Sequence, residues 1–567
     1  MKKKWWHEKI GYQIYPKSFL DTNGDGVGDL AGVIEKLPYL EQLGVDILWL
    51  SPVYPSPMVD NGYDISDYEN IDPRFGTLED MDRLIAEAKK KNISIIMDLV
   101  VNHCSDQHAW FQKAIADPKG PYGDYFYLKE GKDGKEPNNW RSYFGGSVWE
   151  KLPGQENLFY YHAYAKEQPD LNWENPALRE EIYKMVNWWL DRGIAGFRID
   201  AIINIKKDLT WEDLPVDGPD GRGFLTNSIT RMQKRDGGTK NGIGVFLREL
   251  KERCFAPHDA FTVGEVFEVD REQLEEFIGE DGYFSTMFAF DPIQSYKKGT
   301  CQCEFDRNMN PDEWKRDVFV NQKLLGDIAF EANIIENHDM ARGATIYIPD
   351  EDYGFASVSA LAGLQVLQRG MPFLYQGQEI GMTNCPFELE DIDDIMTLDN
   401  YRYAVACGFP EEKAFAGCAR ESRDNARTPM QWSDAENAGF TTGKPWLKVN
   451  PSYPEINVAR QEKEYGSVLN FYRRLLCFRK SEEYRDLLTY GTFEPMYEDQ
   501  EKIFAFKRCL GKQCLTVICN ESPAERFLTL KEDYEEVVFV NLPQVTRIGD
   551  NLILHPYQLI VVETTKK

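Results

Sequence analysis

The feature that most constrains the fold is an alternation of short apolar runs with amphipathic helical stretches in the first 105 residues. Residues 46–57 and 93–103 are apolar runs with turn residues after them, which is typical of buried parallel strands. Between them, residues 78–92 carry apolar side chains at helical spacing, with charged flanks. Strand–helix–strand alternation predicts βαβ units and a parallel sheet, and therefore an α/β fold.

The residue composition and the hydrophobic periodicity of the sequence change twice along the chain. Residues 104–170 are rich in Gly, Pro, Asn and aromatics, lack a helical period and are too long for a plain connection, which predicts an inserted subdomain. Alternation resumes with a predicted helix at 176–193, and beyond 488 only short β-type runs remain. Further strands are predicted at 196–201, 260–266, 334–339 and 371–379. We therefore expect a (β/α)8 barrel (1–103 and 171–488), a loop-rich subdomain B (104–170) and a C-terminal antiparallel β-sandwich (489–567).

Charge and cysteine usage narrow the partners and the compartment. Lys and Arg number 65 against 93 Asp and Glu, a formal charge of −28, which argues against nucleic acid or anionic lipid as a partner. The basic start lacks the apolar stretch of a signal peptide, and no run approaches 18 apolar residues. The 11 cysteines are scattered, and their one close pair, Cys301 and Cys303, has no second pair to complete a zinc site. These features predict reduced thiols and a cytoplasmic protein without a membrane span.

Ionisable side chains stand at the carboxyl ends of four predicted strands. In a (β/α)8 barrel these ends line the active site, so acids there are functional candidates, whereas most other acids of such a chain are solvated surface. The candidates are His103, Arg198, Asp200, Glu265, His338 and Asp339.

The same residues carry a resemblance to a known family. DLVVNH, GFRID, VGE and ENHD, in this order and spacing, resemble four characteristic segments of the α-amylase superfamily of glycoside hydrolases. QPDLNW at 168–173 resembles a fifth segment in its oligo-1,6-glucosidase form, and SRDNARTPMQW and YQGQEIGMTN are similar to bacterial α-glucosidases. The resemblance covers nearly the whole chain.

The resemblance implies a retaining mechanism, which uses two carboxyl groups about 5–5.5 Å apart. It makes Asp200 the nucleophile, held by Arg198, whose positive charge we expect to favour the ionised carboxylate. Glu265 is the implied acid/base, for which a raised pKa is expected. Asp339 is the implied third acid, which holds sugar hydroxyls around the distorted ring.

Other residues are implied as contacts to the terminal, non-reducing glucose. Those expected to bind sugar hydroxyls or to close the pocket and enforce exo action are Asp60, Tyr63, His103, His338 and Arg423. Phe144 and Phe159 of the insertion are candidate hydrophobic walls, with a plain core role an equal alternative.

The segment 21–29, DTNGDGVGD, has oxygen ligands at alternate positions. It opens like an EF-hand, but Gly32 stands where that motif needs Glu, so it is not an EF-hand. It resembles the single calcium loop of this subfamily; the alternative is a turn rich in Asp and Gly. The expected ligands of a structural calcium ion are Asp21, Asn23, Asp25, the Val27 carbonyl and Asp29.

The main functional hypothesis is an exo-acting α-glucosidase on short α-gluco-oligosaccharides. Ala201, next to the nucleophile, is expected near the aglycone; in the family, Ala or Thr there is typical of members that prefer α-1,4 bonds, and Val of those specific for α-1,6 bonds. Ala201 therefore predicts activity on α-1,4 bonds, with some α-1,6 activity retained. The alternatives are an oligo-1,6-glucosidase, a trehalose-6-phosphate hydrolase and a sucrose isomerase, although isomerases usually carry a secretion signal. A catalytically inactive, transporter-associated homologue is disfavoured by the three acids and the lack of an expected span.

Overall fold

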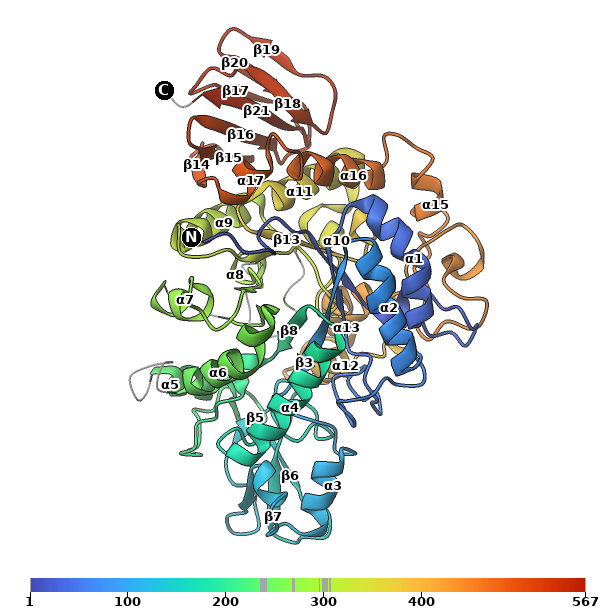
Figure 1. The fold of residues 1–567 in the computed structure, drawn as a ribbon, viewed down its shortest axis with the longest axis vertical. Helices are drawn as coiled ribbons and strands as arrows, with labels where there is room; N and C mark the ends of the chain where they lie inside the picture. The colour runs from blue at the N-terminus through green and yellow to red at the C-terminus, as the bar shows by residue number, and fades with distance from the viewer. Residues whose placement is uncertain are drawn as a thin grey trace.

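The centre of the molecule is a parallel sheet of eight strands, ordered β11-β10-β8-β3-β2-β1-β13-β12 (Figure 1). The structure is a computed structural model that describes residues 2–565 except 235–241, 268–270, 295, 298–303 and 305–306. A parallel bridge between Phe288 and Ala332 links the two ends of the sheet, so it closes into the predicted barrel. The strands are β1 (Gly11–Ile14), β2 (Ile47–Leu50), β3 (Ser94–Val100), β8 (Gly196–Asp200), β10 (Phe261–Gly264), β11 (Thr286–Met287), β12 (Ala332–Asn333) and β13 (Met371–Tyr375).

Close pairing of β8 and β10 brings the predicted nucleophile and acid/base together. Gly196 opens β8 at φ +151°, and a Cβ there would lie 1.7 Å from the Phe261 carbonyl oxygen. Only glycine therefore permits this approach. Asp200 ends β8, and Glu265 directly follows β10, with its backbone N–H donating to the Ile199 carbonyl at 3.0 Å.

The barrel helices begin and end where the sequence supplies caps. Helix α2 (Leu78–Lys90) starts with a capping box between Thr77 and Asp80, and α4 (Pro176–Arg192) starts after Asn175 and ends before Gly193. None of the helices among the described residues is long and apolar enough to span a membrane. The other main helices are α1 (Leu30–Leu43), α5 (Thr226–Lys234), α6 (Ile243–Leu250), α7 (Arg271–Ile278), α8 (Asp291–Gln294), α9 (Pro311–Leu325), α10 (Gly343–Tyr347), α11 (Phe355–Leu367), α12 (Ile395–Ala406), α13 (Glu411–Glu421), α15 (Val458–Gln461), α16 (Val468–Arg479) and α17 (Arg485–Tyr490).

The strand predicted at 334–339 is wrong in its position. Strand β12 ends at Asn333, and the following residues turn. Glu336 accepts from the Gly343 backbone N–H and pairs with Arg342, while the Asn337 side chain accepts from the Asp339 backbone N–H at 2.8 Å. These polar contacts favour a turn over continued β-strand pairing, so Asp339 lies beyond the end of β12.

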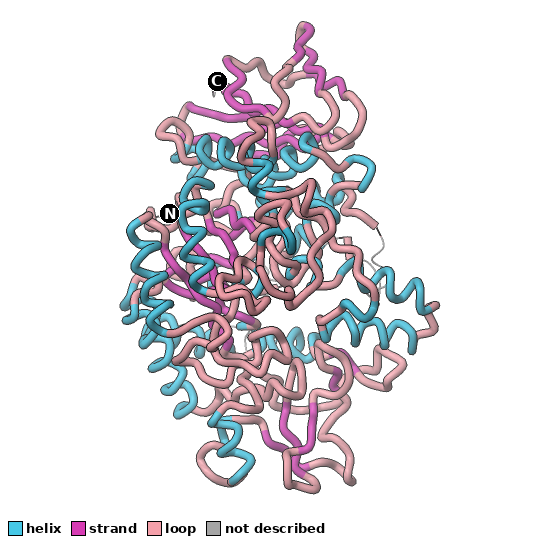
Figure 2. The backbone as a smooth tube through the Cα atoms, turned by 90° about the vertical axis from the view of Figure 1, so that its right-hand side faces the viewer, coloured by secondary structure: helices cyan, strands magenta, loops and turns pink. Residues whose placement is uncertain are grey.

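The insertion forms a small unit of its own at the lower end of the molecule (Figure 2). It holds an antiparallel sheet of β4 (Leu128–Glu130), β7 (Leu158–Tyr161) and β6 (Trp149–Lys151). The expectation of no helix is wrong, because α3 (Ala109–Ala116) forms with its N-terminus capped by His108. Strand β5 (Trp140–Arg141) pairs with β9 (Gly223–Phe224) of a later loop, so that loop joins the insertion.

The chain ends in two antiparallel sheets, ordered β14-β15-β16-β21-β18 and β17-β20-β19, as the sequence predicts. Directly opposite residues Cys509 and Cys514 of β15 and β16 form a disulfide, so the prediction of reduced thiols is wrong for this pair. Cys301 and Cys303 lie outside the described residues. The strands are β14 (Glu494–Met496), β15 (Ile503–Leu510), β16 (Gln513–Asn520), β17 (Arg526–Thr529), β18 (Glu536–Val540), β19 (Thr546–Ile548), β20 (Asn551–Leu554) and β21 (Leu559–Thr565).

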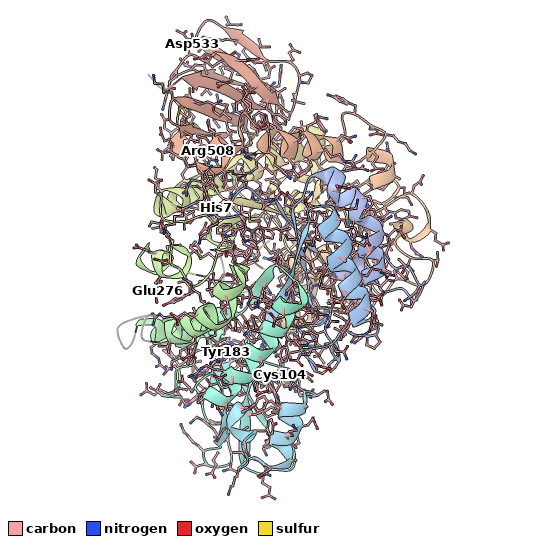
Figure 3. The ribbon with its side chains drawn as sticks, in the orientation of Figure 1. His7, Cys104, Tyr183, Glu276, Arg508 and Asp533 are labelled. Carbon is pink, nitrogen blue, oxygen red and sulfur yellow. A yellow bond between two sulfur atoms is a disulfide. The ribbon has the colours of Figure 1, made fainter. Side chains whose placement is uncertain are left out.

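Arg508 joins this C-terminal region to the barrel (Figure 3). Its fully buried guanidinium donates to the carbonyls of Leu367, Gly491 and Thr492 at 2.9–3.0 Å. Leu367 ends α11, so the charge lies at the negative end of a helix dipole, where a cation is stabilised.

Candidate active site

A cavity of about 560 Å³ opens at the carboxyl ends of the barrel strands. Most residues predicted from the sequence line it, from the barrel and from the insertion. They are Asp60, Tyr63, His103, Phe144, Asp200, Ala201, Glu265, Asp339 and Arg423. Arg198 and His338 are fully buried and are not among the lining residues.

Arg198 is the centre of the charges beneath the cavity. Its guanidinium donates to Asp98 at 2.8 Å and to Asp200 at 2.7 Å. A second nitrogen, Nη2, lies 3.0 Å from a carboxylate oxygen of Glu265. One positive charge therefore serves three carboxylates, and it contacts both predicted catalytic acids.

Arg198 favours the ionised form of Asp200, as expected, but burial opposes it more strongly. Burial is the largest cause of a pKa for Asp200 well above its usual value; Arg198 opposes it, while Glu265, Asp98 and Asp339 add to it. This raised pKa of Asp200 was not predicted from the sequence. Asp200 and Glu265 therefore compete for the positive charge of one arginine in a buried site.

His338 supports the cavity from beneath. Its ring stacks on Tyr63 with centroids 5.3 Å apart, and its Nε2 faces the Tyr63 hydroxyl and lies 3.0 Å from Asp339. Burial alone would raise the pKa of Asp339, but His338, Arg423 and Arg427 hold it well below its usual value. Asp339 is therefore a fixed negative charge in the wall.

Arg423 ties three carboxylates together at one end of the cavity. Its guanidinium lies 3.0 Å from Asp60, 3.3 Å from Asp339 and 2.7 Å from Asp394, with the Phe144 ring 5.3 Å away. Burial alone would raise the pKa of Asp394, but Arg423 and Arg427 lower it to about 2. We call Asp60, Asp339, Asp394 and Arg423 the inner end of the cavity.

His103 reaches the same end from β3. Its Nε2 lies 3.0 Å from the Tyr63 carbonyl oxygen, and burial lowers its pKa, so the ring is neutral. Gln168 of the insertion donates to Asp60 at 3.2 Å. The start of the QPDLNW segment therefore supports the carboxylate at the inner end.

Ala201 differs in conformation from the predicted strand residue. Strand β8 ends at Asp200, and Ala201 adopts φ 44° and ψ 31°, the left-handed region that L-residues rarely occupy. Its backbone N–H donates to Glu265 Oε2 at 2.8 Å. Turn geometry, not strand alternation, therefore brings its methyl group to the cavity.

Residues 13–491 match the protein-family model that is described as "Alpha amylase, catalytic domain". The chain belongs to the alpha-amylase family. It is thus a glycoside hydrolase. An oligo-1,6-glucosidase of Halalkalibacterium halodurans is 41% identical over 94% of this chain and 96% of its own, and a glucan 1,6-alpha-glucosidase of Streptococcus pneumoniae is 40% identical over 99% and 100%.

Solved structures of alpha-amylase family members superpose closely. The isomaltulose synthase of a Klebsiella species matches with TM-score 0.91 and 35% identity, covering 99% of this chain and 100% of its own. The trehalulose synthase of Pseudomonas mesoacidophila matches with TM-score 0.90 and 37% identity over all of both chains. A further trehalulose synthase variant is a complex with sucrose, which is named there as the substrate.

Phe159 does not line the cavity of this alpha-amylase family chain. It lies in β7 of the insertion and belongs to a buried aromatic cluster with Trp140, Trp149 and Trp211. Its ring contributes to the core of the small sheet, and the prediction of a substrate wall is wrong for this residue.

Several lining residues escaped the sequence analysis because loops and the insertion bring them in. Tyr143 and Tyr164 stack at 5.0 Å, and Asn204 donates to the Tyr164 hydroxyl at 2.8 Å. No spacing in the sequence links these three positions. The other lining residues that the analysis missed are Ile203, Phe224, Thr226, Ile229, Phe267, Asp291, Lys297 and Met396.

The predicted calcium loop is a tight turn held by its own side chains. Asp21 accepts the backbone N–H groups of Asn23, Gly24 and Gly26, and Asp29 caps α1 through Gly32. The expected metal ligands of this loop are all oxygen atoms, which is the ligand type that calcium prefers. Across the described part of the chain, however, no three His, Cys, Asp or Glu side chains converge as metal ligands, those of this loop included.

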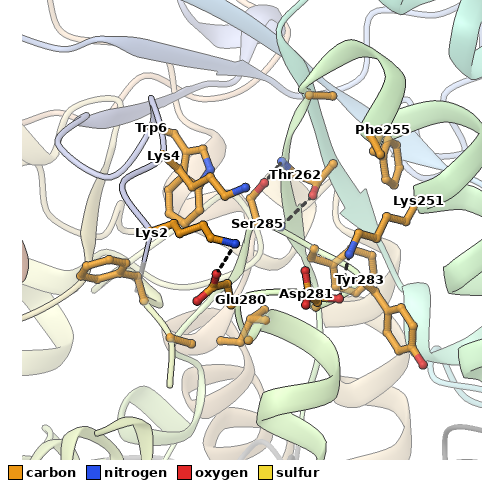
Figure 4. Close-up of a pocket in the computed structure, with 18 of the residues that line it drawn as sticks. Lys2, Lys4, Trp6, Lys251, Phe255, Thr262, Glu280, Asp281, Tyr283 and Ser285 are labelled. Carbon is orange, nitrogen blue, oxygen red and sulfur yellow. Dashed lines mark hydrogen bonds and ion pairs between the residues drawn. The ribbon is translucent and has the colours of Figure 1, made fainter. Parts of the chain in front are cut away.

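A second cavity, of about 260 Å³, lies at the amino-terminal end of the strands (Figure 4). Lys2 pairs with Glu280 at 2.9 Å, and Lys251 donates to the Asp281 carbonyl at 2.7 Å. None of the predicted site residues lines it. That end of a barrel usually serves stability, so the catalytic candidate is the cavity at the carboxyl ends of the strands.

Proposed function

We propose that this glycoside hydrolase is a retaining, exo-acting α-glucosidase that removes the terminal non-reducing glucose from short α-1,6-linked oligosaccharides. The observation that carries the proposal is the inner end, where buried Arg423 ties Asp60 to Asp339. Fixed charges there suit the hydroxyls of one terminal glucose. The names of the relatives support α-1,6 bonds over the α-1,4 preference that Ala201 predicts.

In the proposed mechanism Asp200 attacks the anomeric carbon while Glu265 gives its proton to the departing oxygen, and the glycosidic C–O bond breaks. Glu265 then takes a proton from water, whose oxygen bonds to the same carbon and displaces Asp200. These steps need a protonated Glu265 and an ionised Asp200 when sugar is bound. Arg198, 2.7 Å from Asp200, supports the ionised nucleophile in that state.

We further propose that α-1,4 bonds are cleaved as a secondary activity, because Ala201 leaves the cavity wall small. A phosphorylated disaccharide has less support. Of the two cations among the described lining residues, Arg423 serves three carboxylates and Lys297 lies 3.7 Å from Glu421.

Sucrose isomerisation is the second candidate, and the likeness to trehalulose and isomaltulose synthases favours it. In that reaction the fructose released from sucrose would replace water as the acceptor of the glucosyl group. The products of sucrose therefore distinguish the two candidates: glucose plus fructose for a hydrolase, a new disaccharide for an isomerase.

The test is a panel of isomaltose, maltose, sucrose, trehalose and trehalose-6-phosphate, with kcat/KM measured for each. We expect isomaltose to be the best substrate and maltose the second. Preference for the phosphorylated disaccharide, or conversion of sucrose mainly into an isomer, would overturn the proposal.

We also propose a structural calcium ion held by Asp21, Asn23, Asp25, the Val27 carbonyl and Asp29. A ligand that binds only the folded loop raises stability with its concentration. The expected result is a higher Tm in excess calcium than in chelator, with little change in kcat at moderate temperature. Equal Tm values in the two conditions would remove calcium from the account.

A further inference from the structure

Asp60 and Tyr63 reach the catalytic cavity from the two ends of one tight turn, residues 60–63, which we call the inner turn. The Tyr63 backbone N–H donates to the Asp60 carbonyl at 3.1 Å. Between them, Asn61 has φ 49° and Gly62 has φ 108°, both in the left-handed region. A non-glycine residue in such a conformation persists only where the surrounding structure holds it. The positions of Asp60 and Tyr63 therefore depend on what anchors this turn.

Asn61 anchors the inner turn to a second segment of the inner end. Its buried side chain does not line the cavity; its amide nitrogen instead donates to Asp393 at 3.0 Å. Asp393 precedes Asp394, which caps the start of α12 and lies 2.7 Å from Arg423. Through Asn61, the turn that carries Asp60 is therefore tied to the segment that carries Asp394.

The opposite side of the Asn61 amide faces Lys17. The Lys17 ammonium donates to Asn61 Oδ1 at 2.6 Å and lies 3.5 Å from the centre of the Trp446 ring, the geometry of a cation–π interaction. An ammonium only donates and a carboxylate only accepts, so Oδ1 must face Lys17 and Nδ2 must face Asp393. The two opposite charges therefore fix the orientation of the amide.

We propose that Lys17 is a positioning residue of the glucose site: by orienting Asn61, it holds the inner turn in the conformation that binds a terminal glucose. The proposal rests on the proposed function only in that the inner end binds one glucose. Because Lys17 acts through the turn, its loss should weaken glucose binding and leave the chemical step at the two catalytic acids nearly unchanged.

The charge of Lys17 provides a readout that a merely structural residue would lack. Burial lowers the pKa of Lys17 to about 8; Asp393 and Asp424 oppose this shift, while Arg427 and Arg74 add to it. The ammonium is therefore present at pH 6 and is lost as pH rises through about 8. The neutral amine no longer selects the orientation of the amide by charge, so glucose binding should weaken on the alkaline side.

The experiment measures Ki for glucose, which is neutral from about pH 6 to about pH 9, against hydrolysis of 4-nitrophenyl α-glucoside, with excess calcium throughout. Lys17→Met keeps the length of the side chain without its charge. We expect it to raise Ki about tenfold at pH 6 and to change kcat less than about threefold. An unchanged Ki, or a loss expressed only in kcat, would overturn the proposal.

Lys17→Arg tests the charge itself, because arginine stays protonated at every pH used. We expect Ki within about threefold of wild type at pH 6. From pH 6 to pH 9, Ki should rise severalfold in wild type and stay constant in Lys17→Arg. A rise in Lys17→Arg as large as in wild type would overturn the proposal, since another group would then be titrating. This comparison holds even if Lys17→Met does not fold.

Lys36→Met is the matched control. Lys36 also lies over an indole ring, 4.7 Å from the centre of the Trp432 ring, and its ion-pair partner is Glu35 on the same helix. Lys36→Met should keep the wild-type Ki and its pH dependence; a rise like that of Lys17→Met would overturn the proposal. The proposed function fails separately: a wild-type enzyme that is inhibited by glucose but leaves isomaltose intact would lose the proposed linkage and keep the role of Lys17.

Discussion

The two ends of the catalytic cavity are built in opposite ways. The inner end is an ion cluster in which Arg423 contacts Asp60, Asp339 and Asp394 within 3.3 Å. The opposite side of the cavity, which we call the outer wall, is mainly apolar and comes from loops and short elements, such as β9 and the first turn of α12. It consists of Ile203, Phe224, Ile229, Phe267 and Met396. The first end suits one glucose with its hydroxyls, and the second tolerates different groups.

The difference teaches where specificity resides in this chain. Buried, paired charges permit one arrangement, since each lost partner leaves an uncompensated charge. Apolar surface is non-directional and accepts any group of suitable size. We therefore expect changes at the inner end to affect all α-glucosides equally and changes at the outer wall to affect their ranking.

The largest effects belong to the two acids between these ends. Asp200→Asn should nearly abolish hydrolysis of isomaltose and of 4-nitrophenyl α-glucoside. Glu265→Gln should lower kcat/KM for isomaltose about 10²–10⁴-fold but spare the nitrophenyl glucoside, whose leaving group needs little protonation. Steady-state kinetics of both variants checks this. Substantial activity of Asp200→Asn on either substrate would refute the role assignment.

The next largest effect is expected at the inner end. Arg423→Lys keeps the charge but cannot reach three carboxylates at once, because a lysine offers one nitrogen. We expect kcat/KM to fall about 10²-fold. The fall should be similar for isomaltose, maltose and methyl α-glucoside. A loss confined to one aglycone would break the comparison between the two ends.

A smaller, selective effect is expected at Ala201. Ala201→Val narrows the cavity wall and should depress kcat/KM for maltose about tenfold more than for isomaltose. Because φ is +44°, a β-branched residue also strains the turn and should lower Tm. Ala201→Gly is the control, because glycine adopts a positive φ without strain and adds no volume. It should leave the ratio of kcat/KM for maltose and isomaltose unchanged. An unmoved ratio in Ala201→Val would remove Ala201 from linkage selection.

The smallest effect is a pH dependence of stability. The folded-state pKa of Asp394 is about 2, below its unfolded value, so its contribution is present above about pH 4 and is lost as pH falls toward 2. Asp394→Asn should lower the free energy of unfolding at pH 6 by an amount on the order of 2 kcal/mol. The gap to wild type should shrink at pH 3, measured by denaturant titration. A gap independent of pH would show that Asp394 is not held as a carboxylate by Arg423.

The sequence predicted the barrel and the residues at its strand ends because both follow from local pattern. Asp200 ends one buried strand and Glu265 directly follows another, and burial of those strands places their ends at the cavity. Asp98 escaped notice because it lies inside β3, where position alone suggests core. Asp394 caps the start of α12 and Asn204 lies in a 3-10 turn after β8. Their approach to the cavity depends on tertiary packing, which no sequence spacing encodes.

The same reasoning explains the two clearest errors. Phe159 has the aromatic character of a sugar-binding wall, but the same character fits the core of the insertion, and only the fold decides between them. The cysteines looked scattered because only the pairing register of β15 and β16 places Cys509 opposite Cys514, and the sequence does not show that register.

The central claim, that the inner end holds one terminal glucose for retaining hydrolysis, is tested most directly by time-resolved NMR of isomaltotriose with the wild-type enzyme. The account predicts that the first products are α-glucose and isomaltose, with β-glucose appearing only later by mutarotation. Initial release of β-glucose, or no cleavage of isomaltotriose, would contradict it.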